Sequence, residues 1–188
     1  MQPIPRTATD YIADKSRIPQ PLWLQIGVFA LCFALLQAAW SFAQGTAVER
    51  LAVDDATVVP ATWLVNLISP AVHASAAGAS IRAVGGGINI LNGCEGFEVL
   101  FLLVAALIVS PMTWGRRVLG LLAGTLFVWL LNQVRILVLF YAYRADQDLF
   151  ALLHGTVAPL VMIVLVTIAF VLFLSLPAER SLADRSPS

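Results

Sequence analysis

The chain has 188 residues, of which 60% are hydrophobic and only 12% charged, and its formal net charge is zero. This composition excludes an ordinary soluble domain and predicts a protein that crosses a membrane several times. A balanced charge also gives no reason to expect nucleic acid as a partner.

The first apolar run covers residues 22–43. It is long enough to cross a membrane, since roughly 20 residues traverse the hydrocarbon core. The preceding residues 1–21 contain Asp10 and Asp14, which are unusual in a secretory leader. Ser41-Phe-Ala43 resembles a small-residue cleavage site, so cleavage stays open as an alternative. We favour an uncleaved first span that follows a cytoplasmic tail.

Residues 44–93 are predicted to form one longer loop outside the membrane. The apolar middle of this loop, 61–68, is too short to span, and we expect it to lie in the membrane interface. Two short runs, 81–84 and 88–91, flank the glycines 85–87. This pattern predicts a short β-hairpin with a glycine turn.

Three further spans are predicted at about 95–112, 118–142 and 152–176, and a second cytoplasmic tail at 177–188. Residues 22–176 would then form a single membrane-embedded domain. The predicted fold is an all-α polytopic membrane protein with about four transmembrane helices.

The distribution of Lys and Arg predicts the orientation of these spans. One side of the membrane would carry seven basic residues, namely Arg6, Lys15, Arg17, Arg116, Arg117, Arg180 and Arg185. The other side would carry three, namely Arg50, Arg82 and Arg144. By the positive-inside rule, both termini are predicted to be cytoplasmic and the loops 44–93 and 143–151 to be external.

Three polar side chains are predicted to meet near the external face. Cys94 opens the second span and His154 opens the fourth. Arg135 lies 17 residues beyond Val118, roughly 25 Å along a helix, which nearly crosses the ~30 Å hydrocarbon core. A thiol, a guanidinium and an imidazole at one depth are the side chains of a cysteine acyl-transfer site.

Each of the three residues suits a role in that chemistry. We expect Cys94 in the first turn of a helix, where the unpaired N–H groups favour the nucleophilic thiolate. His154 would act as general base and acid. Arg135 would stabilise an oxyanion or bind the substrate, because a guanidinium inside the membrane costs at least ~2.5 kcal/mol and calls for a function. Snorkelling of Arg135 to the interface is the alternative.

Further residues are candidates for supporting this site. Asn132 shares a helix face with Arg135, and Glu98 follows Cys94 by four residues. Glu98 would orient His154 or Arg135, or form a salt bridge with Arg135. No spacing typical of a metal site or of a phosphate-binding loop is found, so we expect no cofactor.

Together these motifs resemble the exosortase/archaeosortase family. The resemblance rests on Cys94 and Gly96 at the start of one helix, on Asn132 and Arg135 late in another, and on His154 at a third. It covers roughly residues 81–155, and the chain would be a compact, single-domain member. Glu95 stands where the family more usually has a small residue.

The resemblance implies a sortase-like cysteine protease or transpeptidase of the cell membrane, with its active site facing the outside or the periplasm. Its substrates would be secreted proteins that end in a short motif, a hydrophobic helix and basic residues. A lipid or another amine would be the acceptor, if water is not. Cys94, Arg135 and His154 would form the site, and membrane lipids would surround it.

Two other functions stay open. A thiol redox protein is disfavoured because such proteins usually pair two cysteines, whereas Cys32 lies in the middle of the first span, far from Cys94. A non-enzymatic assembly or transport subunit would use Arg135 in a binding cavity. That function predicts that Cys94 can be replaced and Arg135 cannot.

Overall fold

The computed structural model describes residues 21–90 and 95–176 and shows a mostly helical protein. Four helical stretches are long and apolar enough to cross a membrane, judged by length and composition: Leu22–Ala43, Ala47–Ile68, Trp114–Ala145 and Gln147–Ser175. A mostly helical protein with four helices long and apolar enough to span a membrane is therefore confirmed, but one of the four is not among the predicted spans.

Helix α2 covers Leu22–Ala43, the predicted limits of the first span. It begins after Pro21, and it ends where Gln44 turns to an extended ψ of 139°. None of its residues is buried inside the protein. A helix that is apolar over most of its length and so little covered by protein is suited to contact with lipid.

The main departure from the predicted fold lies in the segment expected to be an outer loop. There, α3 (Ala47–Glu49) leads into the π-helical stretch η1 (Arg50–Val58) and then into α4 (Val59–Ile68). The Thr46 side chain caps this start by accepting a hydrogen bond from the Val48 N–H. The apolar 61–68 segment is thus the end of a 22-residue helix and not a short stretch in a loop.

The glycine-rich hairpin is confirmed. After the short 3-10 helix η2 (Pro70–Val72), strand β1 (Ser75–Ala77) pairs with β2 (Ser80–Arg82), and β2 pairs with β3 (Ile88–Asn89), both antiparallel. Ile81 lies opposite Ile88 in this register. The sequence did not predict the first of the three strands.

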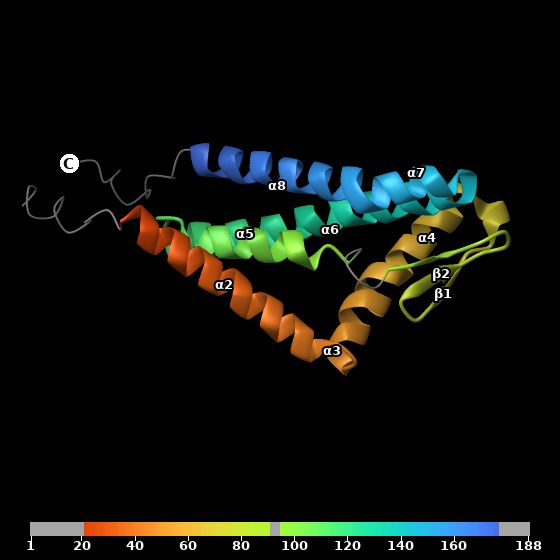
Figure 1. The fold of residues 1–188 in the computed structure, drawn as a ribbon, viewed down its shortest axis with the longest axis horizontal. Helices are drawn as coiled ribbons and strands as arrows, with labels where there is room; N and C mark the ends of the chain where they lie inside the picture. The colour runs from red at the N-terminus through yellow and green to blue at the C-terminus, as the bar shows by residue number, and fades with distance from the viewer. Residues whose placement is uncertain (1–20, 91–94, 177–188) are drawn as a thin grey trace, which may run out of the picture.

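Helices α5 (Phe97–Val109), α6 (Trp114–Ala145) and α8 (Ala158–Ser175) lie side by side along the long axis of the molecule (Figure 1). Helix α8 continues from α7 (Gln147–Leu152) through the π-helical stretch η3 (Leu153–Val157). Helix α2 packs on α5 and diverges from α8 as it approaches α3.

The three later predicted spans differ in length from the helices observed. Helix α6 extends over Trp114–Ala145, where 118–142 was predicted. Helix α5 has 13 residues and is about 20 Å long, shorter than the hydrocarbon core, whereas 95–112 was predicted. The fourth helical stretch begins at Gln147 and not at residue 152, because the Asp146 carboxylate accepts hydrogen bonds from the N–H groups of Asp148 and Leu149. His154 therefore lies inside a helix, in η3, and does not open it.

The helix formed by η1 and α4 follows the C-terminal half of α6 in the same direction. The Trp129 indole N–H donates to the carbonyl of Ala56 at 2.7 Å, and further along the Tyr141 hydroxyl meets the Ser69 hydroxyl at 2.9 Å. Residues of this helix, of the small sheet and of α6 form one buried apolar cluster, which includes Val58, Ile81, Ile136 and Phe140.

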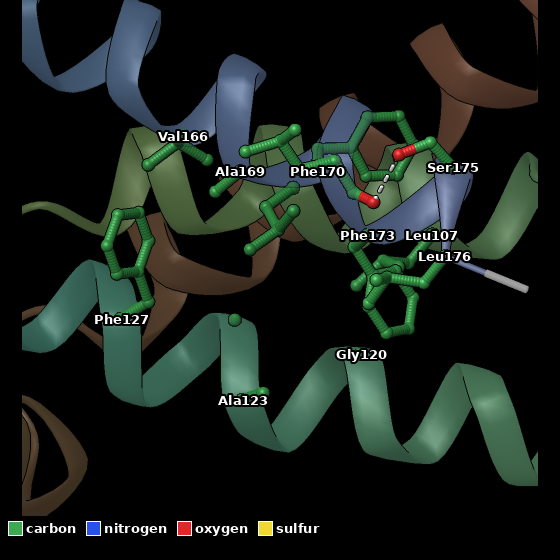
Figure 2. Close-up of a pocket in the computed structure, with 13 residues that line it drawn as sticks. Leu107, Gly120, Ala123, Phe127, Val166, Ala169, Phe170, Phe173, Ser175 and Leu176 are labelled. Carbon is green, nitrogen blue, oxygen red and sulfur yellow. Dashed lines mark hydrogen bonds between the residues drawn. The ribbon is translucent and has the colours of Figure 1, made fainter.

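The other half of α6 packs against α5 and α8 through two glycines. A Cβ atom on Gly124 would lie 2.6 Å from a methyl of Leu103, and one on Gly120 would lie 2.9 Å from Leu107 and Phe173. An apolar cavity of about 520 Å³ remains beside them. Figure 2 shows the side chains that line it. Close approach at small residues is a usual way for helices to pack in membranes.

Candidate functional site

A cavity of about 550 Å³ opens between α2, α5 and α8 near the N-terminus of α5. Its lining differs from that of the apolar cavity, because polar side chains contribute to it: Gln37, Ser41, Gln44, Glu95, Glu98 and Arg135. Polar groups gathered between apolar membrane helices are costly, and they usually mark a site of function.

Arg135 reaches this cavity from α6, and only 7% of its surface is exposed. Its Nη1 lies 3.9 Å from the sulfur of Met162, a weak acceptor, and its Nε is buried without a hydrogen-bond partner among the described residues. Burial of this kind favours a role inside the protein over snorkelling to the interface, the alternative role. A guanidinium with so few hydrogen-bond partners has donors available for a carbonyl or an oxyanion.

Asn132, one turn before Arg135, holds the segment that leads into α5. Its amide Nδ2 donates to the carbonyl of Glu95 at 3.1 Å. The next residue, Gly96, has a φ of +79°, and a Cβ atom there would lie 3.0 Å from the Asn132 side chain. Both the backbone conformation and the close contact favour glycine at this position, and together they fix the backbone that follows residue 94.

Cys94, the predicted nucleophile, lies outside the described residues. Helix α5 begins at Phe97 with Gly96 as its N-cap, so the predicted helix start before residue 94 was wrong. Glu98 occupies the first turn of α5 and is exposed on the wall of the polar cavity. Gly96, Glu98 and Arg135 thus line one cavity.

His154 lies in η3 and does not line the polar cavity. Its imidazole stacks on Phe150, with ring centroids 5.3 Å apart and an angle of 6° between the planes. The stretch η3 contacts α6, the helix that carries Arg135. The cavity residues that follow His154 most closely along the chain are Pro159 and Ile163 of α8.

The sequence predictions missed the contribution of α2 to this cavity. Gln37, Ser41 and Gln44 are spaced by four and three residues, so they form one polar stripe at the end of an otherwise apolar helix. That spacing is visible in the sequence, but the apolar length of 22–43 by itself indicates only a membrane anchor.

The described part of the chain offers no metal site, since no three His, Cys, Asp or Glu side chains converge within it. The polar cavity brings together a buried guanidinium, two carboxylates and several neutral polar groups.

The chain was also compared with known proteins. No protein-family model, no curated protein and no solved structure matches it.

Proposed function

We propose that the protein is a membrane-embedded cysteine protease or transpeptidase that resembles the exosortase/archaeosortase family and cleaves C-terminal sorting signals. The observation that carries this proposal is Arg135, a buried and poorly paired guanidinium on the wall of a polar cavity. Asn132 anchors the backbone of Glu95 at the same cavity, directly after Cys94 in the chain. A buried guanidinium close to Glu95, the residue that follows Cys94 in the sequence, supports acyl transfer.

In the proposed reaction, His154 takes the proton of the Cys94 thiol, and the sulfur attacks the carbonyl carbon of the scissile peptide bond. Arg135 stabilises the negative charge that develops on the carbonyl oxygen. The C–N bond then breaks, and His154 returns the proton to the leaving amine. Water or an amine of a lipid or other acceptor finally attacks the thioester and releases the thiol.

The lengths of the helices support a site near one membrane surface. Arg117, which donates to the carbonyls of Leu107 and Ser110 at the turn between α5 and α6, suits one boundary of the hydrocarbon core. Arg135 follows 18 residues later, roughly 27 Å along the helix, close to the opposite boundary. By the positive-inside rule, that second boundary is the external or periplasmic one.

The same placement assigns a role to Ala47–Ile68. This helix has the length to span, but it lies beside the half of α6 that would approach and leave the outer boundary. Exposed apolar side chains on α4, namely Val59, Trp63 and Leu67, fit contact with the outer membrane interface. We therefore propose that this helix rests in the interface, and that the shorter α5 completes the set of crossing helices.

The decisive test is to co-express the protein with a tagged secreted protein from the same genome that ends in a short motif, an apolar helix and basic residues. We expect cleavage by the wild type, none by Cys94→Ala, and unchanged cleavage by Cys32→Ala. Cys32 is the matched control because it is a free, half-buried cysteine within α2, outside the polar cavity. An adduct of Cys94 with the substrate that neutral hydroxylamine releases would identify the thioester.

The same variants decide between this function and the assembly or transport subunit. Unchanged processing in Cys94→Ala would refute the peptidase proposal. If the Arg135→Met variant then lost secretion of the partner protein while Cys94→Ala kept it, a non-enzymatic binding role would be the better explanation. A disulfide between Cys94 and a partner protein would instead favour the redox function.

A further inference from the structure

The polar cavity adjoins a second, apolar cavity along α5. This smaller cavity of about 200 Å³ shares Val99, Leu102 and Ile163 with it and is lined by apolar side chains from α2, α5 and α8, with Thr167 as the one polar exception. The two cavities together therefore form a groove with α5 as its floor, α2 and α8 as its walls, and a polar end at Arg135.

The groove is bordered by helices that leave room for another segment. None of the residues of α2 is buried, and α2 diverges from α8 in the direction of the polar end (Figure 1). Most of α8 is likewise uncovered, with only Met162 and Val166 buried. A ligand could thus enter sideways from the membrane without passing through the packed half of the bundle.

The charges of the polar end distinguish between possible occupants. Two carboxylates, Glu95 and Glu98, accompany the single guanidinium of Arg135. Phosphate groups require donors and are repelled by carboxylates, so this end is poorly suited to a phospholipid headgroup. The side-chain amides of Gln37 and Gln44 offer both donors and acceptors, which are what the N–H and C=O groups of an unwound peptide need inside a membrane. The Ser41 hydroxyl donates to the Gln37 carbonyl at 3.0 Å and adds an acceptor.

We propose that α2 recognises the substrate: a membrane-spanning polypeptide segment enters between α2 and α8 and lies on α5. Its unwound end is hydrogen-bonded by Gln37, Ser41 and Gln44 in front of Arg135. The inference rests on the proposed function, because it assigns the place where the hydrophobic helix of a sorting signal binds. It adds a recognition surface on a helix that would otherwise serve only as an anchor.

The first test uses a photo-crosslinking benzoylphenylalanine in the Cys94→Ala protein, so that binding is measured without cleavage. The probe is the tagged secreted protein with its C-terminal helix, co-expressed in the same membrane. Position Phe33 lines the polar cavity, whereas Leu35 is exposed on α2 and lines neither part of the groove. We expect at least tenfold more crosslinking to the C-terminal segment of the probe from position 33 than from position 35.

The second test compares two substitutions of the same chemistry on one helix. Gln37→Leu removes a hydrogen-bonding group from the cavity, and we expect cleavage to slow about three- to tenfold, the usual range for one lost hydrogen bond. Gln25→Leu, near the start of α2, is the matched control and should leave the cleavage rate unchanged.

The outcomes separate the two proposals. Equal crosslinking from positions 33 and 35 in the Cys94→Ala protein, or crosslinks to phospholipid alone, would overturn the groove; if the wild type still cleaves its substrate, the peptidase proposal would stand. Selective crosslinking at position 33 without cleavage by the wild type would support the groove and overturn the peptidase proposal. Equal effects of Gln37→Leu and Gln25→Leu on the cleavage rate would also count against substrate recognition by the polar stripe of α2.

Discussion

The two halves of helix α6 differ in how their side chains are satisfied. In the first half, Gly120 and Gly124 bring α5 and α8 into close contact, and the surrounding side chains are apolar. In the second half, three buried polar atoms have no hydrogen-bond partner among the described residues: Asn132 Oδ1, Gln133 Oε1 and Arg135 Nε. Unpaired buried groups are rare in proteins, and they destabilise the fold. The first half is built for stability, and the second keeps groups available for a ligand.

The largest expected effect is that of Arg135→Met, which tests whether the second half of α6 serves a ligand. Cleavage should fall at least a hundredfold, because losing one oxyanion donor typically costs about 2.7–4 kcal/mol of transition-state stabilisation. Stability should not fall and should rise by roughly 1–2 kcal/mol, because a poorly paired buried charge is removed from an apolar bundle. Parallel assays of cleavage and of thermal unfolding in detergent measure both effects.

The interpretation that Arg135 serves a ligand and not the fold requires that Arg135→Met lowers activity and raises stability. A protein that loses activity and stability together after Arg135→Met would show that the guanidinium supports the fold. Arg135→Lys serves as the control for charge, since it keeps a cation but loses the planar set of donors. It should recover only a small part of the activity.

The next largest effect concerns the packed half. Gly124→Val places new carbon atoms where a Cβ would already lie 2.6 Å from Leu103, and overpacking of this kind costs about 1–3 kcal/mol. The midpoint of thermal unfolding should fall. Gly27→Ala on α2 is the control, because the new methyl group would have no atom within 4 Å and alanine favours a helix. Equal destabilisation by both substitutions would contradict the assigned packing.

Elements that a local sequence pattern defines were predicted correctly, and one helix without such a pattern along its whole length was missed. Apolar length alone defined α2 correctly, and the glycines between two short apolar runs defined the hairpin. The helix at Ala47–Ile68 was missed because its acidic residues lowered the hydropathy of its first half. Its start was nevertheless marked, since Thr46-Ala-Val-Glu49 is a capping-box pattern.

The burial of two candidate site residues, Arg135 and Asn132, was predicted from the sequence. Arg135 and Asn132 stand out because buried polar residues in a membrane helix are expensive, and both are indeed buried. The start of the helix that carries His154 was misplaced, although Asp146 is a recognisable N-cap. The contribution of α2 depends on which helix packs beside it, and no local pattern contains that information.

A third prediction concerns the backbone beside the candidate nucleophile. Gly96→Ala would put a side chain at a φ of +79° and against Asn132, at a cost of roughly 1–2 kcal/mol. We expect this cost to be relieved partly by a shift of the segment, with cleavage reduced about tenfold. A double-mutant cycle with Asn132→Ala measures the contact, and purely additive effects would show that the two residues do not act together.

The smallest expected effect belongs to Gln133, and it tests whether every unpaired polar group in the second half of α6 serves the site. The Gln133 side chain makes one long hydrogen bond, 3.5 Å to the carbonyl of Thr57, and it does not line the polar cavity. Gln133→Leu should therefore change cleavage less than twofold and stability by less than about 1 kcal/mol. A large loss of cleavage would extend the site toward η1. Unchanged cleavage would restrict it to the face that carries Arg135 and Asn132, which is the face the polar cavity and the Glu95 carbonyl meet.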